Sequence, residues 1–307
     1  ALERLAAKEL QKYLYSATGT LLPISGAADG DAIAVGTPAS NPLAARFKPD
    51  VSGLGDEGYL LRTIRDGKRR IVLVTGKKPQ GVLYGAYALL EEYGFGFYLG
   101  GDAVPTKSEF KLLDIDITRK PALKIRGTLP WYNFFNSPTA WDFEDYAWFF
   151  DNLVKTKNNF IGFHSYDAEP FAGYKEGDKY AWAEPVVSTA VSTWGTSPMK
   201  TGEFGGETSK YFHTDYFGSK PSLYRDDRER SIRDSQDLLA KALDYGKARG
   251  LKICVGFETG EADPTDPAAI DRLEKRLKHL VAQYPMLDHI WIWEPEAQGL
   301  RGRDPLP

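Results

Sequence analysis

The first third of the chain combines helical spacing of apolar residues with short extended segments. Apolar positions three and four residues apart predict one helix over residues 2–16 and a second over 79–93. Between the two helices, Asp66-Gly67 favours a tight reversal and predicts a hairpin. The strands predicted in this part cover 31–36, 57–65 and 69–75. Together these patterns indicate a small α+β layer, with two helices against a mostly antiparallel sheet.

From about residue 122 the pattern changes to strands that alternate with longer helices, which is typical of βα units and a parallel sheet. The predicted strands cover 123–128, 159–164, 251–257 and 289–293, and the predicted helices cover 142–156, 232–249 and 267–284. These strands make about half of a closed (β/α)8 barrel. We therefore expect an α/β protein: a small α+β domain at 1–118, and at 119–307 about the first half of a TIM barrel.

A long segment, residues 167–231, separates the second predicted barrel strand from its helix. It is rich in Gly, Ser, Thr and aromatic residues, and it is too long for a plain connection. We expect an insertion that forms part of a site, with Trp194 among its aromatic residues. A solvated loop with a minor aromatic cluster is the alternative.

The chain opens at Ala1 inside a predicted helix, and only part of a barrel fits before Pro307. We expect residues 1–307 to be part of a longer protein.

Amino-acid composition and charge limit the kinds of ligand or partner that the protein can be expected to bind. The 307 residues carry a net charge of -3 with no basic stripe, which argues against a nucleic acid or an anionic membrane surface. No apolar run approaches the roughly 20 residues that cross a bilayer. Cys254 is the single cysteine, so no internal disulfide can form. Aromatic residues make up 13% of the chain; a surplus of this kind lines sugar-binding clefts, although aromatic side chains also fill ordinary cores.

Alternation along the predicted barrel strands brings polar residues to one face. Side chains at alternate strand positions face the barrel axis, and active sites form at the carboxyl ends of the strands. If the bulky apolar residues, including Trp291 and Trp293, face the helices, each strand presents one polar residue inward at its end. These residues are Arg126, His164, Glu258 and Glu294. Because strands commonly end in polar residues, chance is the alternative.

Glu294 and Glu296 follow an apolar strand rich in tryptophan, Ile290-Trp291-Ile292-Trp293. Apolar surroundings raise the pKa of a carboxyl group, and a glycosidase general acid must stay protonated near neutral pH. The alternative is that Glu294 caps a helix or pairs with an arginine.

Two stretches of the chain resemble known glycoside hydrolases. Residues 1–105 resemble the N-terminal domain that precedes the barrel in family 67 α-glucuronidases, and its counterpart in family 20 β-hexosaminidases. The matching residues are Glu9-Leu10, Tyr13-Leu14, Thr18-Gly19, Leu22-Pro23-Ile24, Ala34-Val35-Gly36, Gly58-Tyr59, Gly81-Val82-Leu83-Tyr84-Gly85 and Leu89-Leu90. Ile125-Arg126-Gly127 is similar to the sugar-binding arginine segment of family 20, and Glu294-Pro295 is similar to the Asn-Glu-Pro motif of clan A. Trp293 replaces the Asn of that motif, and no Asp-Glu pair closes the strand.

The resemblance implies a glycoside hydrolase that acts on a polysaccharide or oligosaccharide from a chain end, including glycans that contain uronic acids. It implies a general acid or acid/base at Glu294, with Glu296 and Glu258 as further catalytic candidates. The second carboxylate would come from Glu258, Glu261, Glu296, Asp167 or Glu169, or from strands that follow residue 307. The candidate substrate-binding residues are Arg126, Trp131, His164, Asp167, Glu169 and Trp194. The resemblance also implies a secreted or periplasmic protein.

No cofactor is expected. The spacing of His164, Asp167 and His213 matches no metal-binding motif, so no metal is expected either. Two other classes stay open: a noncatalytic glycan-binding protein, and a polysaccharide lyase in which Arg126 neutralises a uronate and His164 assists proton removal. Sugar identity, linkage, stereochemical outcome and oligomeric state do not follow from the sequence.

Overall fold

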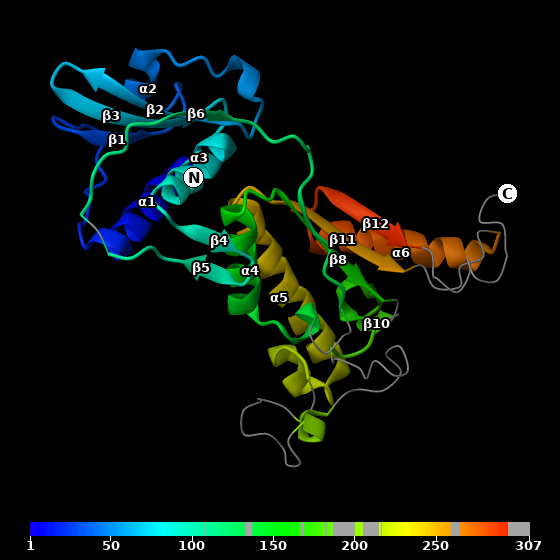
Figure 1. Cartoon of the computed structure of the whole chain (residues 1–307). Coiled ribbons are helices and arrows are strands. Elements are labelled where there is room, and N and C mark those ends of the chain that lie inside the picture. Colours follow the sequence, from blue (N-terminus) through cyan, green and yellow to red (C-terminus); the bar gives the residue numbers. More distant parts are fainter. Residues whose placement is uncertain are drawn as a thin grey trace. The chain divides into compact units, whose positions relative to one another are not determined.

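The computed structural model describes residues 1–107, 109–132, 137–166, 169–181, 183–186, 200–204, 215, 217–258 and 265–293. The chain divides into two compact units (Figure 1). The first comprises Ala1–Arg126, Asp151–Asn159 and Ala248–Gly250. The second comprises Gly127–Phe150, Phe160–Lys247 and Leu251–Pro307.

The first unit is an α+β layer, as the sequence predicts. Its sheet has the order β1-β3-β2-β6; β1 runs parallel to β3, whereas β2 is antiparallel to both β3 and β6. The strands are β1 (Ala32–Val35), β2 (Tyr59–Asp66), β3 (Arg69–Gly76) and β6 (Asp116–Arg119). The helices are α1 (Leu2–Thr18), α2 (Pro42–Phe47) and α3 (Pro79–Glu92). The two long helices and the hairpin were predicted, whereas α2, β6 and the hairpin of β4 (Gly96–Tyr98) and β5 (Gly101–Ala103) were not.

Glycine brings α3 close to the sheet. A Cβ atom on Gly81 would lie 2.1 Å from the carbonyl oxygen of Gly58, which directly precedes β2. A larger residue at position 81 would therefore push α3 away from β2. Every residue from Gly81 to Leu90 is buried as a result. This helix is therefore the centre of the hydrophobic core of the first unit.

The second unit contains a parallel sheet with the order β12-β11-β8-β7. Its strands are β7 (Gly127–Thr128), β8 (Phe160–Ser165), β11 (Lys252–Glu258) and β12 (His289–Trp293). The helices α4 (Phe143–Lys155), α5 (Arg228–Ala248) and α6 (Pro267–Gln283) alternate with them along the chain. Strand order and direction agree with the predicted βα units. Within the residues that the structure describes, the sheet stays open and forms no closed barrel.

Alternate residues of β8 pack against the helices. Phe163 contacts Phe150 and Tyr146 of α4, with ring centroids 6.1 and 5.8 Å apart. In β11, Phe257 lies under the guanidinium of Arg276 from α6, 4.6 Å from the ring centroid. The predicted face assignment of these two strands is thus confirmed. It follows that His164 and Glu258, each one position further along its strand, lie on the opposite face of the sheet.

The described parts of the 167–231 segment form short elements. They are η3 (Pro170–Ala172), β9 (Tyr174–Glu176), β10 (Lys179–Ala181), η5 (Thr201–Phe204) and η6 (Lys220–Tyr224). β9 and β10 pair as an antiparallel hairpin. A separate 3-10 turn, η1 (Ser52–Leu54), lies in the first unit. In the described part of the chain, no helix is both long and apolar enough to cross a membrane.

Candidate active site

His164 and Glu258 meet at the carboxyl ends of two adjacent parallel strands. Because Gly256 of β11 pairs with His164 of β8, Glu258 lies two residues further along on the same face. Nε2 of His164 is 3.4 Å from Oε1 of Glu258, and the two side chains are only 1% and 14% exposed. The sequence placed both residues at this end of the sheet, and the structure brings them into direct contact.

Aromatic rings surround the His164 imidazole. The ring of Trp131 lies 4.1 Å away between centroids, and those of Tyr166 and Trp293 lie 5.4 and 5.9 Å away, edge to face. Backbone hydrogen bonds place Trp131 beside this strand end, since His164 donates its N–H to Pro130 and accepts one from Tyr132. The candidate Trp131 therefore lies where the sequence expected a substrate contact. Flat apolar rings next to polar groups are typical of ligand sites.

Both ring nitrogens of His164 lack a hydrogen-bond partner among the described residues. A buried polar group without a partner costs about 1–3 kcal/mol, so such groups are rare in folded proteins. At a strand end that carries a carboxylate and indole rings, a ligand hydroxyl would satisfy this imidazole. The unpartnered nitrogens are therefore consistent with a binding role.

Glu169 adds a second carboxylate next to Glu258. It directly precedes η3, and its Oε2 accepts a hydrogen bond of 2.9 Å from the backbone N–H of Tyr166. Burial raises the pKa of Glu169 well above its usual range; the Tyr166 hydrogen bond opposes this rise, and the negative charge of Glu258 adds to it. Glu169 consequently keeps its proton to higher pH than an exposed glutamate.

Sequence reasoning gave Glu169 no special rank among the carboxylates. The signal that could have raised it is the apolar run Pro170-Phe171-Ala172 directly after it, which indicates that the segment enters the core. All three of those residues are buried. A carboxyl group attached to a buried turn is the kind of group whose pKa rises.

Trp291 and Trp293 lie on the same face of the sheet as His164, so the expectation that they face the helices was wrong. Trp291 pairs with Gly256 and Trp293 pairs with Glu258. A Cβ on Gly256 would lie 2.7 Å from the Cβ of Trp291, so the missing side chain makes room for that indole. Both faces of this strand are apolar, and the choice between them depended on a glycine in the neighbouring strand.

Arg126 was expected at the same rim, and this expectation was wrong. It precedes Gly127, which pairs with Phe160, the first residue of β8, so Arg126 stands at the amino end of the strands. Its guanidinium donates to Oε2 of Glu57 at 2.6 Å, and to the carbonyl oxygens of Lys157 and Leu123. The assignment relied on a long first strand, but β7 has only two residues, and the preceding segment does not belong to the sheet.

The other candidates, Asp167, Trp194, Glu261, His213, Glu294 and Glu296, lie outside the described residues. Across the described ranges, no group of His, Cys, Asp and Glu could hold a metal ion.

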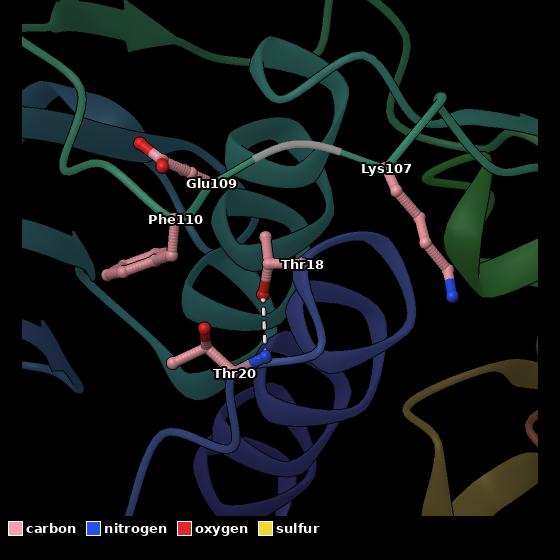
Figure 2. Close-up of a pocket in the computed structure, with 5 residues that line it drawn as sticks. All are labelled: Thr18, Thr20, Lys107, Glu109 and Phe110. Carbon is pink, nitrogen blue, oxygen red and sulfur yellow. Dashed lines mark hydrogen bonds between the residues drawn. The ribbon is translucent and has the colours of Figure 1, made fainter.

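A cavity of about 540 Å³ lies in the first unit. Figure 2 shows the residues that line it: Thr18, Thr20, Lys107, Glu109 and Phe110. Thr18 accepts a hydrogen bond of 3.1 Å from the backbone of Thr20, and Glu109 pairs with Lys111 at 3.8 Å. The cavity contains no residue of the predicted site.

Comparison with known proteins agrees with this architecture. Residues 3–89 match the family described as the glycosyl hydrolase family 67 N-terminus. The N-terminal part of the chain is therefore similar to this type of domain, which confirms the resemblance seen in the sequence. The match ends before the parallel sheet begins.

Among solved structures, several glycoside hydrolases align with the chain, and one of the following three does so at a TM-score above 0.5. A GH138 enzyme targeting pectin rhamnogalacturonan II aligns with 95% of this chain and 29% of its own length, at a TM-score of 0.52 and 13% identity. A GH20 exo β-N-acetylglucosaminidase from Vibrio harveyi, in an inactive mutant form, gives a TM-score of 0.47 at 13% identity over 92% of this chain and 40% of its own. CpGH84B gives 0.48 at 13% identity over 95% and 39%. The chain thus spans well under half of these structures. No curated protein matches the chain in sequence.

Proposed function

We propose that the protein is a glycoside hydrolase that cleaves O-glycosyl bonds of an oligosaccharide or polysaccharide by carboxylate catalysis. The observation that carries the proposal is Glu258 at the end of β11, beside a buried imidazole and a tryptophan ring, together with Glu169, which directly precedes η3 and whose pKa is raised by burial and by the charge of Glu258. Glycosidases use two carboxyl groups that differ in protonation. The family 67 type of the N-terminal domain supports the same class.

The two described carboxyl groups stand in different surroundings, and each suits a different role. The raised pKa of Glu169 suits a proton donor to the leaving oxygen. Glu258 lies beside His164, where it can act as nucleophile or base. Glu294, with Glu296 as a supporting residue, is a second proton-donor candidate through its resemblance to the clan A motif. The alternation that placed Glu294 inward assumed that Trp291 and Trp293 face the helices, and these two residues lie on the face of His164 instead. Glu169 and Glu294 therefore compete for one role, and substitution separates them.

The aromatic rings indicate how a sugar would bind. Trp131 and Trp293 present indole rings around His164, and the apolar face of a pyranose packs against such rings while its hydroxyls reach the imidazole and carboxylates. We propose attack from a chain end, with uronic-acid-containing glycans among the substrates and a periplasmic or extracellular location, as the resemblance implies.

The test is hydrolysis of a panel of aryl α- and β-glycosides, including glucuronides. Glu258→Gln should lower kcat/KM by at least roughly a hundredfold, because loss of a catalytic carboxylate removes this much or more. Glu274→Gln is the matched control, since Glu274 lies on the exposed side of α6 and pairs only with Lys278 among the ion pairs of the described residues. Full activity of Glu258→Gln would contradict the proposal.

A noncatalytic glycan-binding protein is the second candidate, favoured by the unpartnered nitrogens of His164 within the described part of the chain. Saturable binding of an oligosaccharide without turnover, abolished by Trp131→Ala, would establish it. The lyase alternative loses support, because the guanidinium of Arg126 is bonded to Glu57 and to backbone carbonyls.

A further inference from the structure

Buried side chains hold every carbonyl of the turn that follows Glu169. Nε2 of Gln236 donates to the carbonyl oxygens of Pro170 and Gly173 at 2.7 and 2.8 Å. The hydroxyl of Tyr284 donates to Phe171 at 2.9 Å, and Nε of Arg276 donates to Ala172 at 3.3 Å. Four successive carbonyls are thus held by donors from α5, from α6 and from the residue directly after α6.

These donors are themselves in the core. Gln236 and Tyr284 are 0% exposed and Arg276 is 4% exposed. Burying an amide, a phenol and a guanidinium is costly unless each is hydrogen-bonded, and apolar residues would fill the same volume without that cost. Three buried polar groups that donate to one turn indicate that this turn is held in a defined position, which apolar packing alone would not require.

The amide of Gln236 has a defined orientation. Its Oε1 faces Nε2 of His279 at 3.1 Å, and burial together with the charge of Lys175 lowers the pKa of His279. A neutral His279 with its proton on Nε2 donates to Oε1, which leaves the Gln236 NH₂ group directed at the turn. Burial also raises the pKa of Tyr284 well above its usual range, so its hydroxyl keeps the proton it donates.

Apolar packing holds the turn from another direction. The ring of Phe171 stacks on that of Tyr132 with centroids 4.0 Å apart, and Phe171 is 3% exposed. Glu169 immediately precedes Pro170, whose ring restricts the backbone of both residues. These contacts hold the backbone that directly follows Glu169.

We propose that Gln236, Arg276 and Tyr284 are positioning residues, which hold the Pro170–Gly173 turn so that the partly buried Glu169 stays where its carboxyl accepts the backbone N–H of Tyr166, within the electrostatic influence of Glu258. The catalytic meaning of this arrangement rests on the proposed function, whereas the arrangement itself does not. The backbone N–H of Tyr166 donates to Glu169, and the charged and titratable groups that interact electrostatically with Glu169 are Glu258 of β11, Tyr132 and Tyr146. Release of the turn would admit water to the carboxyl.

The direct test is the titration of Glu169 in the full chain by carbon NMR of labelled glutamate carboxyl groups. The resonance that disappears in Glu169→Gln identifies the residue. Tyr284→Phe removes one oxygen atom, and Gln236→Leu removes both donors while keeping similar bulk. We expect each to lower the Glu169 midpoint toward 4.5, the usual value, because the turn is released.

Two matched controls remove buried hydrogen bonds elsewhere. Tyr84→Phe deletes a tyrosine hydroxyl that donates to the carbonyl of Asn158 at 2.8 Å, and Ser235→Ala deletes a buried hydroxyl on α5 that bonds Ser231. Both should leave the Glu169 midpoint unchanged. If Gln236→Leu does not fold, Tyr284→Phe alone decides the outcome.

A wild-type midpoint near 4.5, or a midpoint that Tyr284→Phe does not move, would overturn the inference. A midpoint that moves as expected in a protein without hydrolytic activity would refute the proposed function and leave the positioning role standing. In an active enzyme, Tyr284→Phe should also shift the alkaline limb of the kcat profile to lower pH, and a purely structural hydrogen bond would not do so.

Discussion

Nε2 of His164 faces Oε1 of Glu258 at 3.4 Å, although one residue lies at the end of β8 and the other at the end of β11. The imidazole is buried and has no hydrogen-bond partner in the described part of the protein, which lowers stability unless a ligand supplies one. Residues of this kind lower stability and serve function.

His164→Phe tests this relationship. Phenylalanine has similar size and packs against Trp131 without unsatisfied nitrogens. The free energy of unfolding should therefore stay equal or rise by up to about 1–2 kcal/mol, and the melting temperature should stay equal or rise with it. Hydrolysis should fall at least roughly tenfold, since Glu258 loses its polar neighbour. Calorimetry and aryl glycoside kinetics measure the two effects. A large loss of stability would show that the imidazole has a structural role instead, and His289→Phe, at an exposed position of β12, is the control.

The raised pKa of Glu169 predicts a pH-dependent stability. Its carboxyl is protonated in both the folded and the unfolded chain at low pH, and above the usual value of 4.5 the unfolded chain loses the proton first. The wild-type protein therefore loses stability as the pH rises from 4.5 through the raised folded-state pKa. Glu169→Gln removes this loss.

The melting-temperature difference between Glu169→Gln and the wild-type protein should thus be near constant below pH 4.5 and should grow in favour of the variant above it. Thermal melts across this range measure the difference. A difference that is independent of pH would mean that Glu169 titrates normally.

Arg126 should behave as a structural residue. Its ion pair with Glu57 has both side chains about four-fifths buried, so Arg126→Met should cost about 1–3 kcal/mol of stability. The variant should keep kcat and KM within about twofold of the wild-type values, because the guanidinium is held by Glu57 and by backbone carbonyls. Denaturant unfolding and kinetics are the measurements. A raised KM with unchanged stability would instead return Arg126 to a sugar-binding role.

Glu294→Gln and Glu296→Gln test the sequence-based assignment of the proton donor. If Glu294 donates the proton, its amide variant should lose at least roughly a hundredfold in rate on ordinary glycosides. It should recover much of that rate on a dinitrophenyl glycoside, which needs little acid assistance. Glu296→Gln should cost less, because we expect Glu296 to position Glu294 or to bind a hydroxyl.

The comparison with Glu169→Gln decides between the two donors. The residue whose amide variant recovers its rate selectively on the dinitrophenyl glycoside is the general acid. Small and equal effects from Glu169, Glu294 and Glu296 variants would argue against glycosidase chemistry at these strand ends.

Local pattern determined most of the secondary structure. The stripe on α1, the Asp66-Gly67 reversal and the alternation in β8 each depend on residues close together in the chain, so the sequence predicted these elements to within a few residues. The same locality explains why His164 and Glu258 could be placed at strand ends, since the apolar partners that define their faces are their own sequence neighbours.

Tertiary contacts decided the rest. The inward turn of Trp291 depends on the space above Gly256 in another strand, and both faces of β12 are apolar. The position of Arg126 depends on Glu57, and the raised pKa of Glu169 depends on burial beside Glu258 in a turn held by Gln236 and Tyr284. By itself the sequence placed His164 and Glu258 at the carboxyl ends of their strands. That these two residues meet was decided only by the fold, because burial and proximity are set by partners far away in the chain.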